Sequence, residues 1–243
     1  MDVERMNSAL AENVTEINRK ISRALLRSVD PSREVKLVAV SKTFPAERIS
    51  EACDAGLFRF GENRVQEIAA KYARLQKKNI EWHFIGGLQT NKVKKLIEIP
   101  TKLIHSVDRL AVALELERQL QKRGDSREVL VEVNTSGETS KSGVQPEKAI
   151  ELIREIASFD AIRVKGLMTI GALTEDNKVV RACFTKLREL FCLIRGDAID
   201  GVEMLEISMG MSGDFEIAVE EGATMIRLGS AIFGERKNTE QPE

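Results

Sequence analysis

The sequence predicts an α/β fold, a (β/α)8 barrel of the TIM type preceded by one extra helix. Three observations lead to this prediction. The chain has 243 residues, a length that suits one such barrel. Eight short apolar runs recur along the chain. Longer amphipathic segments separate these runs, at roughly 30 residues per strand–helix unit. A doubly wound open sheet is the structural alternative.

The extra helix is predicted over residues 3–26, ahead of the first strand. The apolar runs have the length and the β-branched content of strands that are buried on both faces, as in a parallel sheet. The eight predicted strands are VKLVAV (35–40), LFRFG (57–61), EWHFIG (81–86), LIHSVD (103–108), VLVEVN (129–134), RVKGLMTI (163–170), VEMLEIS (202–208) and MIRLGS (225–230).

The segments between the runs place apolar residues on one face at helical spacing. The helices predicted in this way span residues 46–55, 63–76, 109–123, 146–159, 175–194 and 215–221. Gly56, Gly124 and Gly222 follow three of them, where a glycine commonly ends a helix, and Pro146 suits a first helical turn. The basic run at residues 91–95 is interpreted as the solvated face of a further helix.

Composition excludes several classes of function. Lys and Arg number 37 against 38 Asp and Glu, so no overall charge favours nucleic acid or an anionic membrane. The three cysteines form no Cys-x-x-Cys motif, which favours a reducing compartment and argues against disulfides or a zinc site. His83 and His105 are far apart in the sequence, so a metal cluster is not expected.

The domain organisation is predicted to be simple. No Pro/Gly/Ser-rich linker divides the chain, so residues 1–243 are expected to form one barrel domain, with residues 1–34 as the helix and lead-in. The charged N-terminal segment does not resemble a signal peptide, and no apolar stretch has the length of a membrane span. These features predict a cytoplasmic protein, which we expect to be a monomer.

Candidate site residues follow the predicted strands, because barrels of this kind form their sites at the carboxyl ends of the strands. Lys42 comes two residues after the first run, and Asn63 follows the second. The loop SMGMSGD begins at Ser208, and Gly229 and Ser230 end the eighth run. Small residues in the loops after strands seven and eight are typical of a phosphate site, where backbone N–H groups bind the anion. The alternative is a pair of ordinary tight loops, with Ser212 capping a helix.

A lysine at the mouth of a barrel is partly shielded from water. Desolvation disfavours its ammonium form, lowers its pKa and makes the amine a nucleophile. Beside a phosphate site, such an amine is suited to form a Schiff base with a phosphorylated aldehyde or ketone. Two ligands fit this description: pyridoxal 5′-phosphate (PLP), or a sugar phosphate in an aldolase. Lys42 could equally be a solvated surface lysine.

Arg227 helps to distinguish these candidates. It lies two residues before Gly229, so that it can reach toward the far side of a bound ring. A guanidinium beside a pyridine nitrogen would donate to it and keep it unprotonated, which makes PLP a weak electron sink. Alternatively, Arg227 forms a salt bridge at the barrel rim.

Seven blocks together resemble the YggS/PROSC family, the pyridoxal phosphate homeostasis proteins, from about residue 35 to residue 236. These blocks are VAVSKTFP, FGENRVQE, WHFIGGLQTNK, HSVDR, VNTSGETSKSG, KGLMTI and SMGMSGDFEIAVEEGATMIRLGSAIFG. Many family members carry a proline where this chain has Gly87, and threonine where it has Ser230, which keeps the hydroxyl.

The resemblance implies a PLP-binding barrel of the superfamily that includes the N-terminal domain of alanine racemase. It implies that Lys42 carries PLP as an internal aldimine and that Arg227 faces the pyridine nitrogen. Ser208, Gly229 and Ser230 would hold the phosphate, with Asn63 near the cofactor. The implied function is intracellular PLP homeostasis, with apo PLP-dependent enzymes as possible recipients and without an established catalytic activity.

The alternative function is that of an amino-acid racemase of the alanine racemase type. Racemisation needs an acid/base group on each face of the substrate. In the racemases the second base is a tyrosine from a further domain. The sequence ends soon after the eighth run, and its one tyrosine, Tyr72, falls in the predicted helix 63–76 on an apolar face. We therefore expect no second base and no enzyme, and a Schiff-base aldolase is the third possibility.

Overall fold

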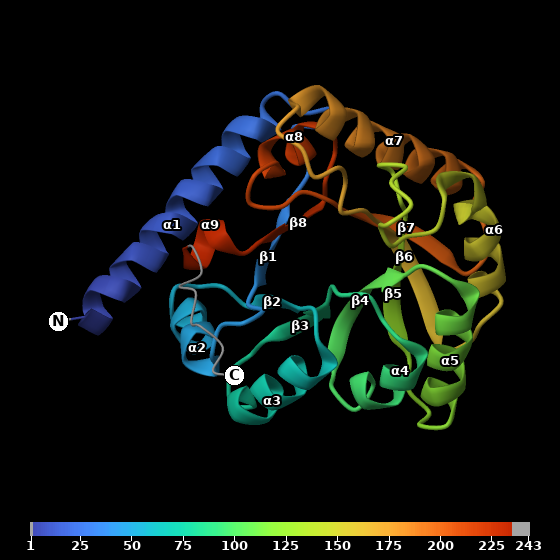
Figure 1. Cartoon of the computed structure of the whole chain (residues 1–243), viewed down its shortest axis with the longest axis horizontal. Helices are drawn as coiled ribbons and strands as arrows, with labels where there is room; N and C mark the ends of the chain where they lie inside the picture. Colours follow the sequence, from blue (N-terminus) through green and yellow to red (C-terminus); the bar gives the residue numbers. More distant parts are fainter. Residues whose placement is uncertain (1, 235–243) are drawn as a thin grey trace.

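Eight parallel strands close into a barrel in which each strand pairs with the next along the chain and β8 pairs with β1 (Figure 1). The computed structural model describes residues 2–234, and the side chains from residue 9 onward. The strands are β1 (Lys36–Val40), β2 (Arg59–Glu62), β3 (Glu81–Phe84), β4 (Thr101–Val107), β5 (Arg127–Glu132), β6 (Ile162–Met168), β7 (Val202–Ser208) and β8 (Met225–Leu228). The predicted barrel is confirmed, and the open sheet is wrong.

Helices surround the barrel on its outer side (Figure 1). They are α2 (Ala46–Asp54), α3 (Val65–Leu75), α4 (Thr90–Leu96), α5 (Leu110–Gln121), α6 (Pro146–Ala157), α7 (Asn177–Gly196), α8 (Phe215–Glu220) and α9 (Ser230–Phe233). The basic run is the exposed face of α4, which buries Val93 and Leu96, as predicted. The eighth strand was predicted too long, because Ser230 already begins α9.

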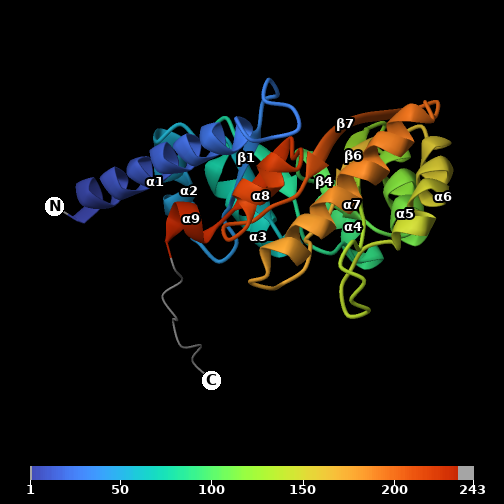
Figure 2. The same ribbon diagram turned by 90° about the horizontal axis from the view of Figure 1, so that it is seen from above.

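The extra helix, α1 (Asp2–Leu25), runs along one side of the barrel beside α8 and α9 (Figure 2). It buries Leu10, Ile17, Ile21 and Ala24, which lie on one face at helical spacing. The amide of Asn13 also donates to the carbonyl oxygen of Ile232 at 3.0 Å. This apolar face explains why a helix outside the strand–helix repeat stays attached to the barrel. None of the helices within residues 2–234 has the length and the apolar content that crossing a membrane requires.

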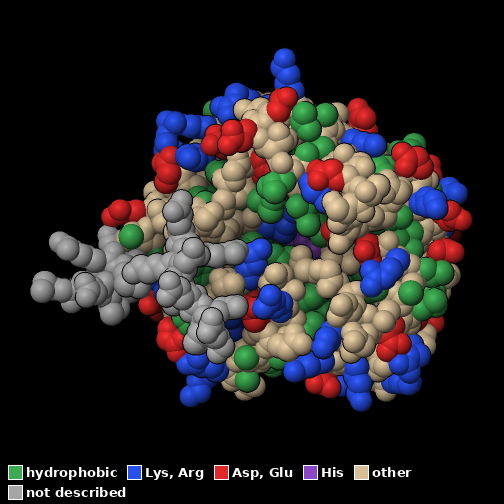
Figure 3. Space-filling view, viewed as in Figure 1, with side chains coloured by type: hydrophobic (Ala, Val, Ile, Leu, Met, Phe, Trp, Pro, Cys, Tyr) green, Lys and Arg blue, Asp and Glu red, His purple; other side chains and the backbone are tan. Residues whose placement is uncertain are grey.

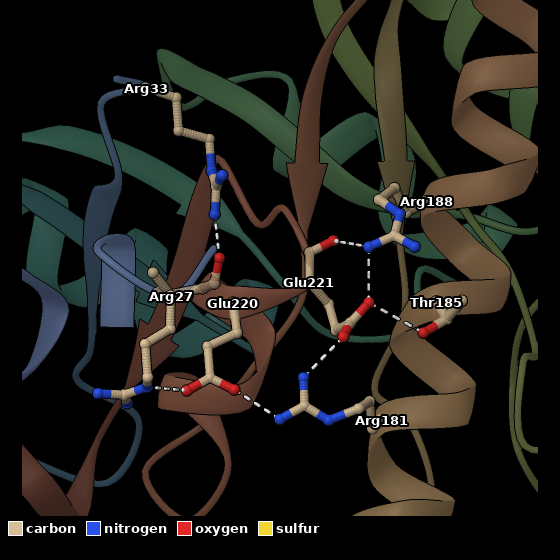
Figure 4. A network of polar contacts seen from close by, with 8 residues as sticks. Arg27, Arg33, Arg181, Thr185, Arg188, Glu220 and Glu221 are labelled. Atoms are coloured by element: carbon tan, nitrogen blue, oxygen red, sulfur yellow. Dashed lines mark hydrogen bonds and ion pairs between the residues drawn. The ribbon is translucent and has the colours of Figure 1, made fainter. Parts of the chain in front are cut away.

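A network of ion pairs joins α7, α8 and the turn after α1 (Figure 4). Glu220 accepts from Arg27 at 2.8 Å and from Arg181 at 2.5 Å. Glu221 accepts from Arg181 at 2.7 Å and from Arg188 at 2.6 Å. Since both carboxylates lie at the end of α8, they attach this short helix to α7 on one side and to the turn after α1 on the other.

Apolar side chains form two cores. The larger lies between the strands and the helices, and a smaller cluster of Val38, Leu103, Leu130, Met168 and Met225 fills the middle of the barrel. Strand residues alternate between these two cores because successive side chains point to opposite faces.

The same alternation determines where charged residues enter the barrel. Along β1, Lys36 lines a pocket at one end of the barrel, and Val38 lies in the inner cluster. Val40 and Lys42 line a pocket at the other end. Lys42 therefore reaches the mouth because it continues the inward-facing register of its strand.

Gly166 allows β6 and β7 to approach closely. Its φ of 151° is a conformation that residues with side chains rarely adopt, and a Cβ atom there would lie 1.8 Å from the carbonyl oxygen of Glu206. The pairing register of β6 and β7 shifts at the same place. A glycine is therefore required at position 166 for β6 and β7 to pair this closely.

Candidate functional site

A pocket of about 420 Å³ opens at the carboxyl ends of the strands. Five of the six predicted site residues line it: Lys42, Asn63, Arg227, Gly229 and Ser230. In the view of Figure 3, the centre of the molecule is hollowed, with Lys and Arg side chains around the hollow and histidine deep within it. The strand ends thus bring together residues that are far apart in the sequence.

The turn after β1 holds Lys42 in a constrained conformation. Lys42 is half-buried, and the next residue, Thr43, has a φ of 71°, which is uncommon for a residue with a side chain. The backbone N–H of Thr43 donates to the carboxylate of Glu67 at 3.0 Å. Such local strain persists only where the surroundings hold it, and it is frequent at functional sites.

A buried cluster of Ser41, Glu62 and Lys71 supports the turn after β1. The Lys71 ammonium donates to Glu62 at 2.7 Å and to the carbonyl oxygen of Ser41 at 2.9 Å, and the Ser41 hydroxyl donates to Glu62 at 2.6 Å. Burial raises the pKa of Glu62, while Lys71 opposes this shift. The sequence-based prediction missed this cluster, although Glu62 stands beside Asn63.

Arg227 is almost fully buried, with 4% of its surface exposed. Burial lowers its pKa to about 10, so the guanidinium stays charged at neutral pH. It donates to the hydroxyl of Ser208 at 2.7 Å and to the carbonyl oxygen of Thr169 at 2.8 Å. A guanidinium has five N–H donors, so donors remain for a ligand in the pocket that it lines.

Ser208 differs from its expected position. It was predicted to hold a phosphate together with Gly229 and Ser230, but it does not line their pocket. Its hydroxyl is fully buried between Arg227 and His105, whose Nδ1 lies 3.0 Å away. Because Ser208 ends β7 in the inward-facing register, it packs under Arg227 rather than beside the loop.

Ser212 and Gly213, from the loop before α8, line the pocket in its place. The hydroxyl of Ser212 accepts from the backbone N–H groups of Gly229 and Ala231, at 3.3 and 3.2 Å. The two predicted loops are therefore in contact, with their backbone amides directed at an oxygen. Ser212 was considered only as a helix cap, but α8 has no side-chain cap of this kind.

Asn63 is positioned by close backbone packing. A Cβ atom on Gly86 would lie 2.2 Å from the carbonyl oxygen of Asn63, so only glycine allows this approach. The side-chain oxygen of Asn63 is buried and has no hydrogen-bond partner within residues 2–234. A buried acceptor at the wall of a pocket is suited to receive a polar group from a ligand.

Glu132 is a site residue that sequence analysis missed. It lines the pocket from the end of β5, with 3% of its surface exposed. Burial, assisted by Asp108, raises its pKa to about 7, and Arg227 opposes the shift. The alternation of VLVEVN could have indicated it, because Leu130 and Glu132 share the inward face.

The two histidines are neighbours in space, contrary to the inference from their distance in sequence. His83 Nδ1 lies 2.9 Å from His105 Nε2, inside the barrel. Among the residues that the structure describes, no group of three His, Cys, Asp or Glu side chains could hold a metal ion. The two histidines take part instead in a hydrogen-bonded chain that reaches Arg227 through Ser208.

The fold and this site define a class of protein, the barrel of the alanine racemase N-terminal domain. The model of that family, "Alanine racemase, N-terminal domain", matches residues 8–237. Within this class, the chain belongs to the family of pyridoxal phosphate homeostasis proteins.

Similar proteins establish the narrower family. The pyridoxal phosphate homeostasis protein of Aquifex aeolicus is 44% identical over 226 residues, which cover 93% of this chain and 98% of that protein. The pyridoxal phosphate homeostasis protein of Pseudomonas aeruginosa is 41% identical over 229 residues, which cover 94% of this chain and 96% of that protein. The structure of PipY of Synechococcus elongatus PCC7942 with PLP bound is 35% identical, covers 93% of this chain and 100% of that one, and superposes with a TM-score of 0.81.

Proposed function

We propose that the protein binds PLP at the mouth of its barrel, attaches it to Lys42, and serves in the homeostasis of this cofactor. The observation that carries the proposal is the pocket that Lys42, Arg227 and the loops after β7 and β8 line together. PipY, whose structure holds PLP, covers nearly the whole chain. The names of the relatives supply the role in homeostasis.

The pocket residues fit the three polar parts of the cofactor. The phosphate would lie against Gly229, Ser230 and the Ser212 hydroxyl, which accepts from the backbone N–H groups of Gly229 and Ala231 and has its own proton left to donate. The aldehyde would lie at Lys42. The unpartnered oxygen of Asn63 would accept from a polar group on the ring.

Arg227 would act on the ring nitrogen. PLP supplies an aldehyde that condenses with amines and a ring that accepts electrons, most strongly when its nitrogen is protonated. Arg227 remains charged at neutral pH, so it donates a hydrogen bond and leaves the nitrogen unprotonated. We assign Ser208 to hold Arg227 in position rather than to bind phosphate.

Such a site favours holding the cofactor over transforming a substrate, so we propose that the protein is not an enzyme. Tyr72, the only tyrosine, packs half-buried on α3 and does not line the pocket. One observation favours the alternative, an amino-acid racemase: Glu132 is a pocket carboxyl with a pKa of about 7, as an acid/base catalyst requires. Chiral analysis after incubation with L-alanine or L-serine decides between them, since sustained formation of the D-isomer would establish a racemase.

The visible absorption spectrum tests the central proposal. We expect the protein to gain an absorption band with PLP, and reduction with borohydride to fix the label on Lys42. The Lys42→Ala variant should lose the band, whereas Lys94→Ala, a matched change on the exposed face of α4, should keep it. Labelling of another lysine in the unaltered protein would refute the attachment.

Delivery needs a separate experiment. The loaded protein, mixed with an apo PLP-dependent enzyme, should restore its activity faster than the release of free PLP allows. Equal rates would refute a carrier role. We further propose a cytoplasmic monomer, supported by unpaired Cys53, Cys183 and Cys192, and sedimentation would test the monomer.

A further inference from the structure

A second pocket, of about 280 Å³, lies at the opposite end of the barrel, where the strands begin. It does not overlap the mouth, because the apolar cluster around Val38 and Leu103 separates the two. Charged residues at the strand starts surround it. They are Lys36, Arg59, Glu81, Lys102, Glu128, Lys165 and Glu206.

Ion pairs explain why charged side chains gather around this pocket. Each cation has a carboxylate partner, and the residues at this end of a barrel usually serve stability. The pairs are Lys36 with Glu206, Arg59 with Glu81 at 3.1 Å, Lys102 with Glu128 at 2.9 Å and Lys165 with Glu203 at 2.7 Å. A ring of ion pairs alone would therefore explain the rim of the pocket, but not its floor.

The floor holds a polar atom that the ion pairs leave unsatisfied. His83 lines the pocket with 2% of its surface exposed, and its Nε2 has no hydrogen-bond partner within residues 2–234. The nearest carboxylate oxygen, on Glu81, lies 4.0 Å away, which is too far for a hydrogen bond. A buried donor or acceptor without a partner destabilises the folded chain, so this nitrogen calls for a partner.

The hydrogen-bonded chain behind His83 determines whether its Nε2 carries a proton. Arg227 can only donate, so Ser208 accepts from it and has its own proton left to give. Fully buried Ser208 has one other neighbour, His105 Nδ1, which therefore accepts. His105 then carries its proton on Nε2 and donates to His83 Nδ1. Consequently His83 carries its proton on Nε2 and presents a donor to the pocket.

The local charges favour an acceptor that is negative. Burial, together with Arg59, Lys36 and Lys102, lowers the pKa of His83 to about 3, so the ring is neutral. Four cations and three carboxylates line the pocket, so its lining has an excess of positive charge. A neutral N–H donor flanked by cations is a common way to bind a carboxylate or phosphate.

We propose that the pocket at the amino ends of the strands is a second binding site, which takes a small oxyanion on the Nε2–H of His83, with Lys36 and Lys102 as its charged neighbours. Carboxylate and phosphate share this chemistry. Because Arg227 can only donate, it sets the direction of the chain through Ser208 and His105, and this direction gives His83 the proton on Nε2 that the anion accepts.

Nitrogen-15 NMR of the imidazoles tests the proposal directly, since the chain contains only two histidines. Assignment uses His83→Gln. We expect both rings to be protonated on Nε2 at neutral pH. Sodium acetate or inorganic phosphate, added at constant ionic strength with sodium chloride, should shift His83 Nε2 saturably. A response to one salt alone identifies the class of anion.

Two variants locate the bound anion. Lys36→Gln should weaken the binding about tenfold, the loss expected for one charged hydrogen bond. Lys94→Gln, on the exposed face of α4, should leave it unchanged. Protonation of His83 on Nδ1, a response that does not saturate, or equal affinity in the two variants would each overturn the proposal. None of these readouts requires PLP, so they are independent of the function proposed for the mouth.

Discussion

Glu132→Gln is expected to stabilise the protein at high pH and to have little effect at low pH. Glu132 is 3% exposed, and its pKa in the folded chain is about 7, against the ordinary value of 4.5. The difference is roughly 2.5 units, which corresponds to about 3 kcal/mol of unfolding free energy. This value already includes the attraction of Arg227, which opposes the effect of burial.

The sign follows from proton binding. Between pH 4.5 and 7 the folded protein holds the Glu132 proton more tightly than the unfolded chain, so its contribution to stability is complete below pH 4.5 and is lost as pH rises through 7. Glutamine has the same shape and never ionises. The variant should therefore match the unaltered protein near pH 4 and exceed it by up to about 3 kcal/mol near pH 8.

Urea unfolding of PLP-free protein at both pH values measures this difference. Glu98→Gln, an exposed carboxylate before β4, is the control and should change stability by less than about 0.5 kcal/mol at either pH. The reasoning would be refuted by an equal effect of Glu132→Gln at the two pH values, or by destabilisation near pH 8.

Three further substitutions test the supports of the site. Lys71→Met leaves Glu62 as a buried unpaired charge, and urea unfolding near pH 8 should show a loss of about 3–5 kcal/mol; a loss below 1 kcal/mol would contradict the pairing. Ser208→Ala removes the hydroxyl that Arg227 contacts, so the affinity for PLP, measured by fluorescence titration, should fall about tenfold while the protein stays folded; unchanged affinity would oppose this role. Gly86→Ala places a Cβ atom 2.2 Å from a backbone oxygen, so calorimetry should show a melting temperature several degrees lower, whereas an unchanged value would mean that the backbone yields.

The sequence pattern predicted the barrel because strand and helix periodicity are local properties. Lys42 and Arg227 were expected at the mouth because they lie at the ends of predicted strands, and both line the pocket there. Strand ends were less accurate: β8 ends at Leu228, two residues before the predicted end, because the chain turns into α9.

Contacts across the barrel could not be predicted in this way. They depend on how neighbouring strands are staggered, and register shifts occur between β3 and β4 and between β4 and β5. For this reason the contact between His83 and His105, 22 residues apart, was not predicted, and Ser208 was placed with the loops rather than under Arg227.

The ion pairs at the end of α8 have a consequence for how surface variants would be interpreted. The loop that carries Ser212 leads directly into α8, whose far end is held by Arg27 after α1 and by Arg181 and Arg188 of α7. Loss of one of these arginines weakens the support of the helix that follows this loop. A genetic screen for loss of cofactor would then recover changes on the outer surface of the protein that reproduce the phenotype of a lesion in the pocket.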